Sequence, residues 1–296
     1  MIKILKTGVL AAVILLVLTQ THPVLSEDTA KIDISKKKYA SLDSLVLKLK
    51  VKGIDIESFL SNPKFEIYEN IDSIFINSAE ALGADAYKEA LKKGDMAEAE
   101  RIFNEEYEKY KKKIGFDDKK GYMTQFMKQY PAELPAAEKQ YLIPGEIIAS
   151  VIGIESDFGR YTGKRQAFNV FISLYVKNYR REFALRQLEE LLIFRGRTNK
   201  DIFDFNSSYA GAIGFMQFIP SSLNQWFVGE DVKNMNDTIN SVANYLAHFK
   251  EKEGSLDKAV YRYNPSKFYV KAVFELAEYG KEMTGTAEIA PDRKDK

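Results

Sequence analysis

Apolar residues recur along most of the chain at the spacing of an α-helix. The helical period begins after Pro63, and further helices are expected over 95–113, 121–141, 167–176, 183–194 and 239–252. Pro131 interrupts or kinks the helix over 121–141. Alternating Leu and Val over 45–51 are compatible with either a short strand or a turn of helix. Because strand signals are few, the pattern predicts a mainly α-helical chain with one principal domain.

The segment Ile143–Gly159 predicts a helix with one carboxylate on its apolar side. Pro144 suits the first helical position, and Gly159 suits the end. Glu155 lies seven residues after Ile148, on the stripe that faces the core. Burial would raise the pKa of this carboxyl from ~4.3 toward 6 or 7, which leaves a proton donor loaded near neutral pH. The alternative is a glutamate that reaches past the last turn to solvent.

A second stretch, Ser207–Ser222, combines small residues with polar side chains in an apolar run. Its glycines allow the backbone to approach another group closely. Ser208 and Gln217 could offer donors and acceptors to a polar, uncharged ligand, or Gln217 could be a buried, satisfied amide in tightly packed helices. Farther along, Asn264 precedes Pro265 and is expected directly after a helix.

Composition excludes several kinds of chemistry. Lys and Arg number 43 against 42 Asp and Glu, so no nucleic-acid partner is expected. The chain has no cysteine and two histidines, His22 and His248, which excludes cysteine nucleophiles and His/Cys zinc sites. A Ser-His-Asp triad would need His248, which we expect on the surface, and no Gly-x-Ser-x-Gly motif supplies its serine.

The first residues have the layout of a secretory signal. Lys3 and Lys6 precede an uncharged run over 7–20, and cleavage is expected near Ser26. An uncleaved anchor is the alternative. The predicted organisation is a signal peptide over 1–26, an N-terminal extension over 27–60, the principal domain over 61–283 and a disordered tail over 284–296.

Four motifs in a fixed order resemble the membrane-bound lytic transglycosylase B family, whose enzymes cleave the glycan strands of bacterial peptidoglycan. The similarity runs from about residue 45 to 280. The motifs are Ile-Gly-Ile-Glu155-Ser, Ser208-Tyr-Ala-Gly-Ala-Ile-Gly-Phe-Met-Gln217-Phe-Ile-Pro-Ser-Ser, Ser-Val-Ala-Asn-Tyr245 and Arg-Tyr263-Asn264-Pro-Ser.

The resemblance implies a lysozyme-like helical domain with a long glycan groove and Glu155 as its single catalytic acid. It implies that Ser208 and Asn264 contact the N-acetylmuramyl group. Gln217 and Tyr245 would line the groove. The remaining positions that match the substrate-binding positions of the family are Tyr263, Tyr110, Arg180 and Arg181. The two arginines could meet the lactyl or peptide carboxylates.

The chain departs from the family in two respects. Familiar members carry an Asp-rich calcium loop, but Phe227–Asp237 is short and lacks the Asp-x-Asp-x-Asp-Gly spacing, so no metal and no other cofactor is predicted. The best-known members are lipid-anchored through cysteine, which this chain lacks. It is therefore expected to be soluble after signal cleavage. The signal implies export to the periplasm or cell envelope, and a monomer is expected. The sequence identifies no partner in wall synthesis or division.

The mechanism that the resemblance implies is non-hydrolytic. Glu155 protonates the oxygen between MurNAc and GlcNAc, then accepts the proton of the muramyl C6 hydroxyl, which attacks C1 to give a 1,6-anhydro sugar. Asp157 is a nearby second carboxylate that points away unless the helix has already ended. The alternatives are a lysozyme-type muramidase and a non-catalytic wall-binding protein that stacks its aromatics, 17 Tyr and 19 Phe, on sugars.

Overall fold

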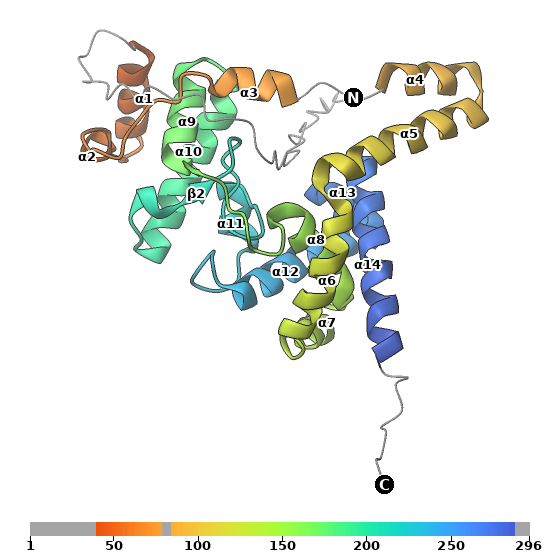
Figure 1. The fold of residues 1–296 in the computed structure, drawn as a ribbon. Coiled ribbons are helices and arrows are strands. Elements are labelled where there is room, and N and C mark those ends of the chain that lie inside the picture. The colour runs from red at the N-terminus through yellow and green to blue at the C-terminus, as the bar shows by residue number, and fades with distance from the viewer. Residues whose placement is uncertain (1–39, 79–83, 288–296) are drawn as a thin grey trace, which may run out of the picture.

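The computed structural model describes residues 40–78 and 84–287 (Figure 1). The predicted signal peptide over 1–26 lies outside these residues. The elements follow in the order α1 (Ala40–Val51), α2 (Glu57–Leu60), α3 (Ile71–Ser78), α4 (Ala84–Lys93), α5 (Met96–Ile114), α6 (Phe116–Gln129), α7 (Glu133–Tyr141), α8 (Gly145–Ser156), β1 (Arg165–Gln166), α9 (Ala167–Val176), α10 (Arg181–Thr198), the 3-10 helix η1 (Ile202–Asp204), β2 (Asn206–Ser207), α11 (Pro220–Trp226), α12 (Met235–Glu253), α13 (Leu256–Tyr263) and α14 (Lys267–Ala287).

The helix boundaries follow local sequence signals. Asp95 caps α5 by accepting a hydrogen bond from the Glu98 N–H at 3.0 Å, and Gly115 ends the helix in the left-handed region. The helix predicted over 121–141 is interrupted at Pro131, between α6 and α7, as predicted. The described residues form a single antiparallel sheet, in which β1 pairs with β2 over two residues each. The prediction of a mainly α-helical chain is confirmed.

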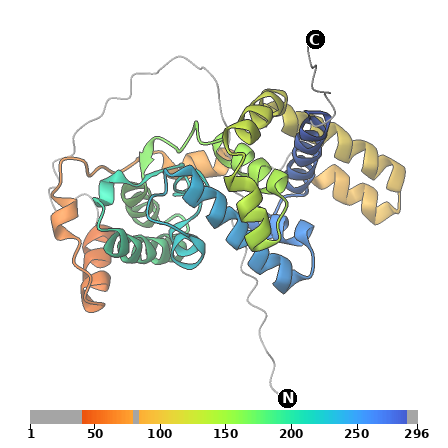
Figure 2. The same cartoon turned by 90° about the horizontal axis from the view of Figure 1, so that it is seen from below.

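Two groups of helices meet around the long α12. In the first, α8 lies against α6, α7, α12 and α14 (Figure 1). In the second, α9 packs on α10 and α1, and α11 joins α10 to α12. The α4–α5 pair projects from the body in both Figure 1 and Figure 2. The helix with the candidate acid, α8, is therefore enclosed by its neighbours.

The ambiguous stretch over 45–51 is helix. In α1, Leu45 and Leu49 are buried, whereas Leu47 and Val51 are exposed. Leu45 and Leu49, four residues apart, face the core as on one side of a helix, and Leu47 and Val51 lie on the other side. Since α1 packs on α9, much of the segment assigned to an N-terminal extension contributes to the same core as the principal domain.

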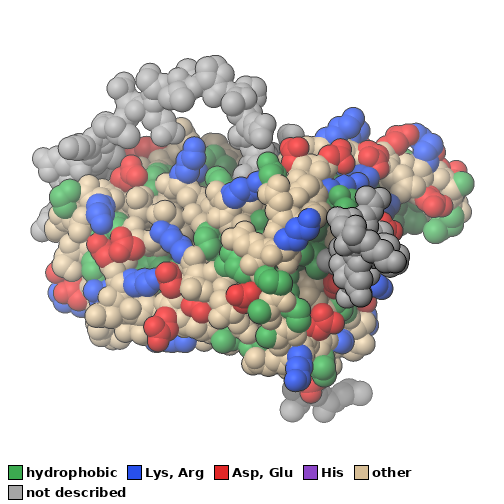
Figure 3. Space-filling model, turned by 60° about the horizontal axis from the view of Figure 1, so that its bottom comes forward, with side chains coloured by type: hydrophobic (Ala, Val, Ile, Leu, Met, Phe, Trp, Pro, Cys, Tyr) green, Lys and Arg blue, Asp and Glu red, His purple; other side chains and the backbone are tan. Residues whose placement is uncertain are grey.

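The C-terminal helix α14 continues to Ala287 and so includes the first residues of the predicted tail. The rest of that tail, 288–296, lies outside the described residues. Among the helices that the structure describes, none combines the length and apolarity needed to cross a membrane. Basic and acidic side chains are interspersed on the face shown in Figure 3, in keeping with the balanced charge of the sequence.

Candidate active site

The helix α8 is shorter than predicted. Pro144 is its N-cap, and the helix ends at Ser156, because Asp157 and Phe158 take left-handed φ values of 54° and 58°. The ring of Phe158 folds back over Gly153, where an added Cβ would be 2.4 Å from the Phe158 Cζ. The early end turns the chain away three residues before Gly159 and leaves Glu155 in the last turn.

Glu155 is buried, with 5% of its surface exposed. Desolvation raises the pKa of its carboxyl to about 8, against the opposing effects of the Tyr269 hydroxyl and the positive charge of Lys119. The alternative of a solvent-directed glutamate is thereby excluded. The carboxyl holds its proton at neutral pH.

Four tyrosines from different helices surround this carboxyl. Burial raises the pKa of each hydroxyl, and the charge of Glu155 adds to the effect. The four are Tyr110 of α5, Tyr245 of α12, Tyr263 of α13 and Tyr269 of α14. Sequence reasoning selected the first three and missed Tyr269. Tyr245 and Tyr263 donate their hydroxyl protons to the carbonyl oxygens of Arg262 and Met216, whereas the Tyr269 hydroxyl acts on Glu155 itself.

Lys119 of α6 is a second residue that the sequence did not reveal. Its side chain is 1% exposed, and its Nζ donates to the carbonyl oxygen of Gly153 at 2.8 Å and to Asp157 Oδ1 at 3.0 Å. Asp157 also pairs with Arg160 at 3.3 Å. The helix has ended at Asp157, as the sequence left open, but this carboxylate is engaged by cations.

Gln217 lies in a tight turn between the bridged residues Ile213 and Phe218. Its φ is 50°, which is strained for a residue with a side chain. The Nε2 donates to the Gly214 carbonyl at 2.8 Å, whereas the buried Oε1 has no hydrogen-bond partner among the described residues. The amide is half satisfied, which favours the ligand-binding interpretation over that of a fully paired core glutamine.

Ser208 begins the turn before Gln217. Its Oγ accepts from the N–H groups of Ala210 and Ala212, both at 3.2 Å, so those contacts leave the hydroxyl proton able to donate. Gly211 packs against the ring of Phe171, where an added Cβ would be 2.2 Å from the ring. This is the close backbone approach that the small residues predicted.

Aromatic contacts join the Gln217 turn to the tyrosines around Glu155. The ring of Phe218 lies 5.5 Å from that of Tyr245 and 5.6 Å from that of Tyr263. The Tyr263 hydroxyl donates to the Met216 carbonyl at 2.6 Å. Asn264 is the C-cap of α13, as predicted, and is buried directly after Tyr263. The turn and the end of α13 thus belong to one cluster.

Arg180 and Arg181 lie at the α9–α10 junction. Arg181 donates to the Tyr175 hydroxyl at 2.9 Å and covers its ring, while Arg180 stacks on Phe183 at 4.3 Å. These contacts link neither arginine to the Glu155 cluster. Their assignment to the groove stays a prediction.

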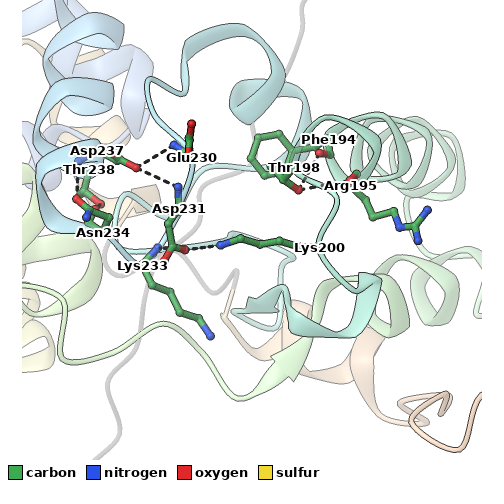
Figure 4. A network of polar contacts seen from close by, with 10 residues as sticks. All are labelled: Phe194, Arg195, Thr198, Lys200, Glu230, Asp231, Lys233, Asn234, Asp237 and Thr238. Carbon is green, nitrogen blue, oxygen red and sulfur yellow. Dashed lines mark hydrogen bonds and ion pairs between the residues drawn. The ribbon is translucent and has the colours of Figure 1, made fainter.

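The loop before α12 is where the resemblance would place a calcium loop. Asp231 pairs with Lys200 at 2.6 Å, and Asp237 Oδ2 accepts the N–H groups of Glu230 and Asp231 at 2.9 and 3.0 Å (Figure 4). These carboxylates already have donors. The described part of the chain also lacks any group of three or more metal-ligating residues. The donor set therefore does not fit calcium.

The remaining histidine of the described chain, His248, is exposed on α12 and lies 4.3 Å from the ring of Trp226. Its predicted surface position is confirmed.

A helical domain with one buried glutamate among tyrosines is compatible with the lysozyme-like class. Comparison with known proteins narrows the class. Residues 77–256 match the family model described as Transglycosylase SLT domain, so the chain belongs to the transglycosylase SLT domain family.

The chain is also similar to individual lytic transglycosylases. The Membrane-bound lytic murein transglycosylase B of Escherichia coli K12 is 32% identical over 146 residues, which span 48% of this chain and 40% of that protein. The E. coli lytic transglycosylase SLT35, solved with bulgecin A, superposes with a TM-score of 0.67 at 20% identity, covering 83% of this chain and 94% of that one.

A third relative, SltB3 of Pseudomonas aeruginosa, solved in complex with NAG-anhNAM-pentapeptide, gives a TM-score of 0.60 at 17% identity and covers 81% of this chain and 78% of that one. These two structural likenesses establish the lysozyme-like fold of the chain.

Proposed function

We propose that this protein is a peptidoglycan lytic transglycosylase, which cleaves the MurNAc-β-1,4-GlcNAc bond without water and leaves 1,6-anhydroMurNAc ends. The observation that supports this most is the state of Glu155: a buried carboxyl whose pKa of about 8 keeps it protonated at neutral pH. Such a group can act as the acid in glycosidic bond cleavage.

The surroundings of Glu155 favour a one-carboxylate reaction. Ordinary glycosidases use two carboxylates, one as acid and one as nucleophile or base. The groups that act on the Glu155 carboxyl are the Tyr269 hydroxyl and Lys119, and the neighbouring Asp157 is held by Lys119 and Arg160. The attacking group must then come from water or from the substrate.

In the proposed reaction, Glu155 gives its proton to the GlcNAc oxygen as the bond from C1 breaks. The 2-acetamido group stabilises the positive charge at C1. Glu155, now ionised, accepts the proton of the muramyl C6 hydroxyl while that oxygen bonds to C1. Intramolecular attack of this kind can be equivalent to roughly 10⁵ M or more, which exceeds the concentration of bulk water.

The polar groups of the cluster have matching roles in the proposal. Ser208 and Asn264 orient the acetamido group of the muramyl unit. The unpaired Oε1 of Gln217 accepts a hydrogen bond from the glycan, and its strained backbone is the kind found at ligand sites. Tyr245 and Tyr110 line the binding region beside Glu155. The arginines 180 and 181 are proposed to meet the carboxylates of the muramyl or peptide part.

The relatives support the same substrate. SltB3 is described in complex with a fragment that carries an anhydro muramyl sugar. Peptidoglycan lies outside the cytoplasmic membrane, so we also propose that the chain is exported by its N-terminal signal and acts in the periplasm or cell envelope as a monomer.

Product analysis tests the proposal. Purified peptidoglycan sacculi are digested with the protein, and the released muropeptides are weighed by mass spectrometry. Anhydro ends, lighter than reducing ends by one water, are expected. Reducing ends would instead identify a lysozyme-type muramidase. Sedimentation of the protein with sacculi but no released product would identify a wall-binding protein.

A further inference from the structure

The ammonium group of Lys119 is buried where a charge is costly. Its side chain is 1% exposed, and desolvation lowers its pKa, although the carboxylate of Asp157 opposes that effect. Buried lysines persist where the charge has a partner or a function. Asp157 accounts only in part for the buried charge of Lys119, because the Asp157 side chain is 23% exposed and also pairs with Arg160.

The contacts of Lys119 flank the candidate acid. Gly153, whose carbonyl accepts from Nζ at 2.8 Å, lies two residues before Glu155, and Asp157, at 3.0 Å, lies two residues after it. One side chain from α6 therefore joins both ends of the segment that carries Glu155. Rotation of the last turn of α8 would break one of these bonds.

The charge of Lys119 also acts on Glu155 directly, since it opposes the increase that burial causes in the pKa of this carboxyl. The other titratable groups that face Glu155 are neutral hydroxyls. The titratable groups that face Glu155 come from five helices packed around it. They are Tyr110 of α5, Lys119 of α6, Tyr245 of α12, Tyr263 of α13 and Tyr269 of α14. Lys119 itself faces Asp157, Arg160 and Glu155. Among the described residues, Lys119 is thus the cation that favours the charged form of Glu155.

The proposed reaction requires such a cation. Between giving up its first proton and taking the second, Glu155 is a carboxylate in a buried site. A buried anion without a cation or donors is strongly disfavoured. The Tyr269 hydroxyl can donate one hydrogen bond, and the charge must come from Lys119.

We propose that Lys119 is a positioning residue, which fixes the last turn of α8 through Gly153 and Asp157 and stabilises the ionised form of Glu155 between the two proton transfers. The inference rests on the proposed function, because a binding protein would have no need of the ionised form.

The test measures proton binding and turnover separately. The pKa of Glu155 is followed by NMR of the side-chain carboxyl carbon in protein labelled with ¹³C-glutamate, with the signal assigned by its absence in Glu155→Gln. Turnover is measured on soluble, uncrosslinked glycan strands over a range of pH. The variants are Lys119→Met and Lys119→Arg. Lys120→Met, from the same helix, is the matched control, because the Lys120 ammonium lies over the rings of Phe116 and Tyr279 and not beside Glu155.

We expect Lys119→Met to move the Glu155 midpoint upward and to reduce kcat at least about tenfold, the equivalent of one pKa unit. Change in KM should be smaller. In Lys119→Arg, which keeps the charge, the Glu155 titration midpoint should lie closer to the wild-type value than in Lys119→Met. Lys120→Met should match the wild type in both measurements. A Lys119→Met protein that melts earlier but keeps the wild-type midpoint and pH profile would overturn the proposal, since its role would then be structural alone.

Asp157→Asn covers the case in which Lys119→Met does not fold. Removing the carboxylate frees the charge of Lys119 to act on Glu155, so the midpoint should move downward, opposite to Lys119→Met. An unchanged midpoint in Asp157→Asn would contradict the inference. The titration needs no turnover. Failure of the wild type to form anhydro product would therefore refute the proposed function, whereas the effect of the variants on the Glu155 midpoint would still be measured.

Discussion

Gly153 lies directly beneath the ring of Phe158, and a methyl group at this position would be 2.4 Å from the Phe158 Cζ. The contact fixes how α8 ends, and with it the position of Glu155 between Gly153 and Asp157. A helix interior ordinarily gains from replacing glycine by alanine, by about 1 kcal/mol. Here the close ring reverses that expectation.

We therefore predict that Gly153→Ala lowers the free energy of unfolding by about 1–3 kcal/mol, the usual cost of overpacking, and reduces glycan cleavage. Gly196 in α10 is the matched control, because an added Cβ there meets nothing within 4 Å. Gly196→Ala should stabilise the protein by about 0.5–1 kcal/mol and leave cleavage intact. Guanidinium unfolding and a muropeptide release assay measure both. Equal stability changes in the two variants would refute the packing argument.

Replacing Glu155 by Gln removes the proton donor and keeps the shape. Cleavage should fall by about 10²–10⁴-fold, the usual contribution of a general acid, while co-sedimentation with sacculi persists. Glu146→Gln, in the first turn of the same helix, is the control and should cleave like the wild type. Wild-type cleavage by the Glu155→Gln protein would remove this residue from the mechanism.

The pKa of Glu155 also makes stability depend on pH. Between its ordinary value of 4.5 and about 8, the unfolded chain releases a proton that the folded chain keeps. In this window the unfolded state binds fewer protons than the folded state. The free energy of unfolding therefore falls as pH rises through the window and levels off above it. The full effect is on the order of 5 kcal/mol.

Glu155→Gln lacks this dependence, so its free energy of unfolding relative to the wild type should increase from pH 4.5 to about pH 8. Guanidinium unfolding of both proteins across the window measures the difference, in which contributions of other groups cancel. Parallel curves for the two proteins would show that the carboxyl is not buried as described.

Two substitutions of Gln217 distinguish the effect of its backbone on stability from the effect of its amide on glycan binding. Gln217→Gly removes the left-handed strain at φ 50° and should be more stable than Gln217→Ala by up to about 1 kcal/mol. Both variants lose the buried amide and should raise KM for soluble glycan. Asn199→Gly, at another left-handed position of the chain, should leave KM unchanged. If Gln217→Gly retained the wild-type KM, the amide would have no place in glycan binding.

Asp231 lies in the loop before α12, where the resemblance would place calcium ligands, and its carboxylate is paired with Lys200. We predict that EDTA changes neither the melting temperature nor cleavage. Lys200→Met should lower stability by up to about 1 kcal/mol, since both side chains are partly exposed. Thermal unfolding with EDTA and with added Ca²⁺ tests this. A calcium-dependent rise in the wild-type melting temperature would contradict the prediction.

Much of the fold was predictable because its signals are local. The Asp95 cap, the Gly115 end of α5 and the break at Pro131 depend on residues adjacent in sequence. The burial of Glu155 followed from the helical period. The early end of α8 did not, because it depends on Phe158 folding over Gly153, and nothing in the sequence marks that contact.

The site was predicted less completely, for a similar reason. Lys119 stands in the run Asp117-Asp118-Lys119-Lys120, which is typical of a solvated surface, and only the packing of α6 on α8 buries it. Tyr269 is one of many tyrosines until α14 brings it to Glu155. Both act through tertiary contacts that no spacing in the sequence reveals.

The direction of α8 has its own effect on the acid. Peptide dipoles along a helix add up to roughly half a negative charge at the carboxyl end, within the last turn. Glu155 stands in that turn. A carboxylate there meets backbone oxygens of the same sign, so the orientation of the peptide groups favours the protonated acid. Were the chain to run the other way through this helix, the same glutamate would face N–H groups and lose its proton more readily.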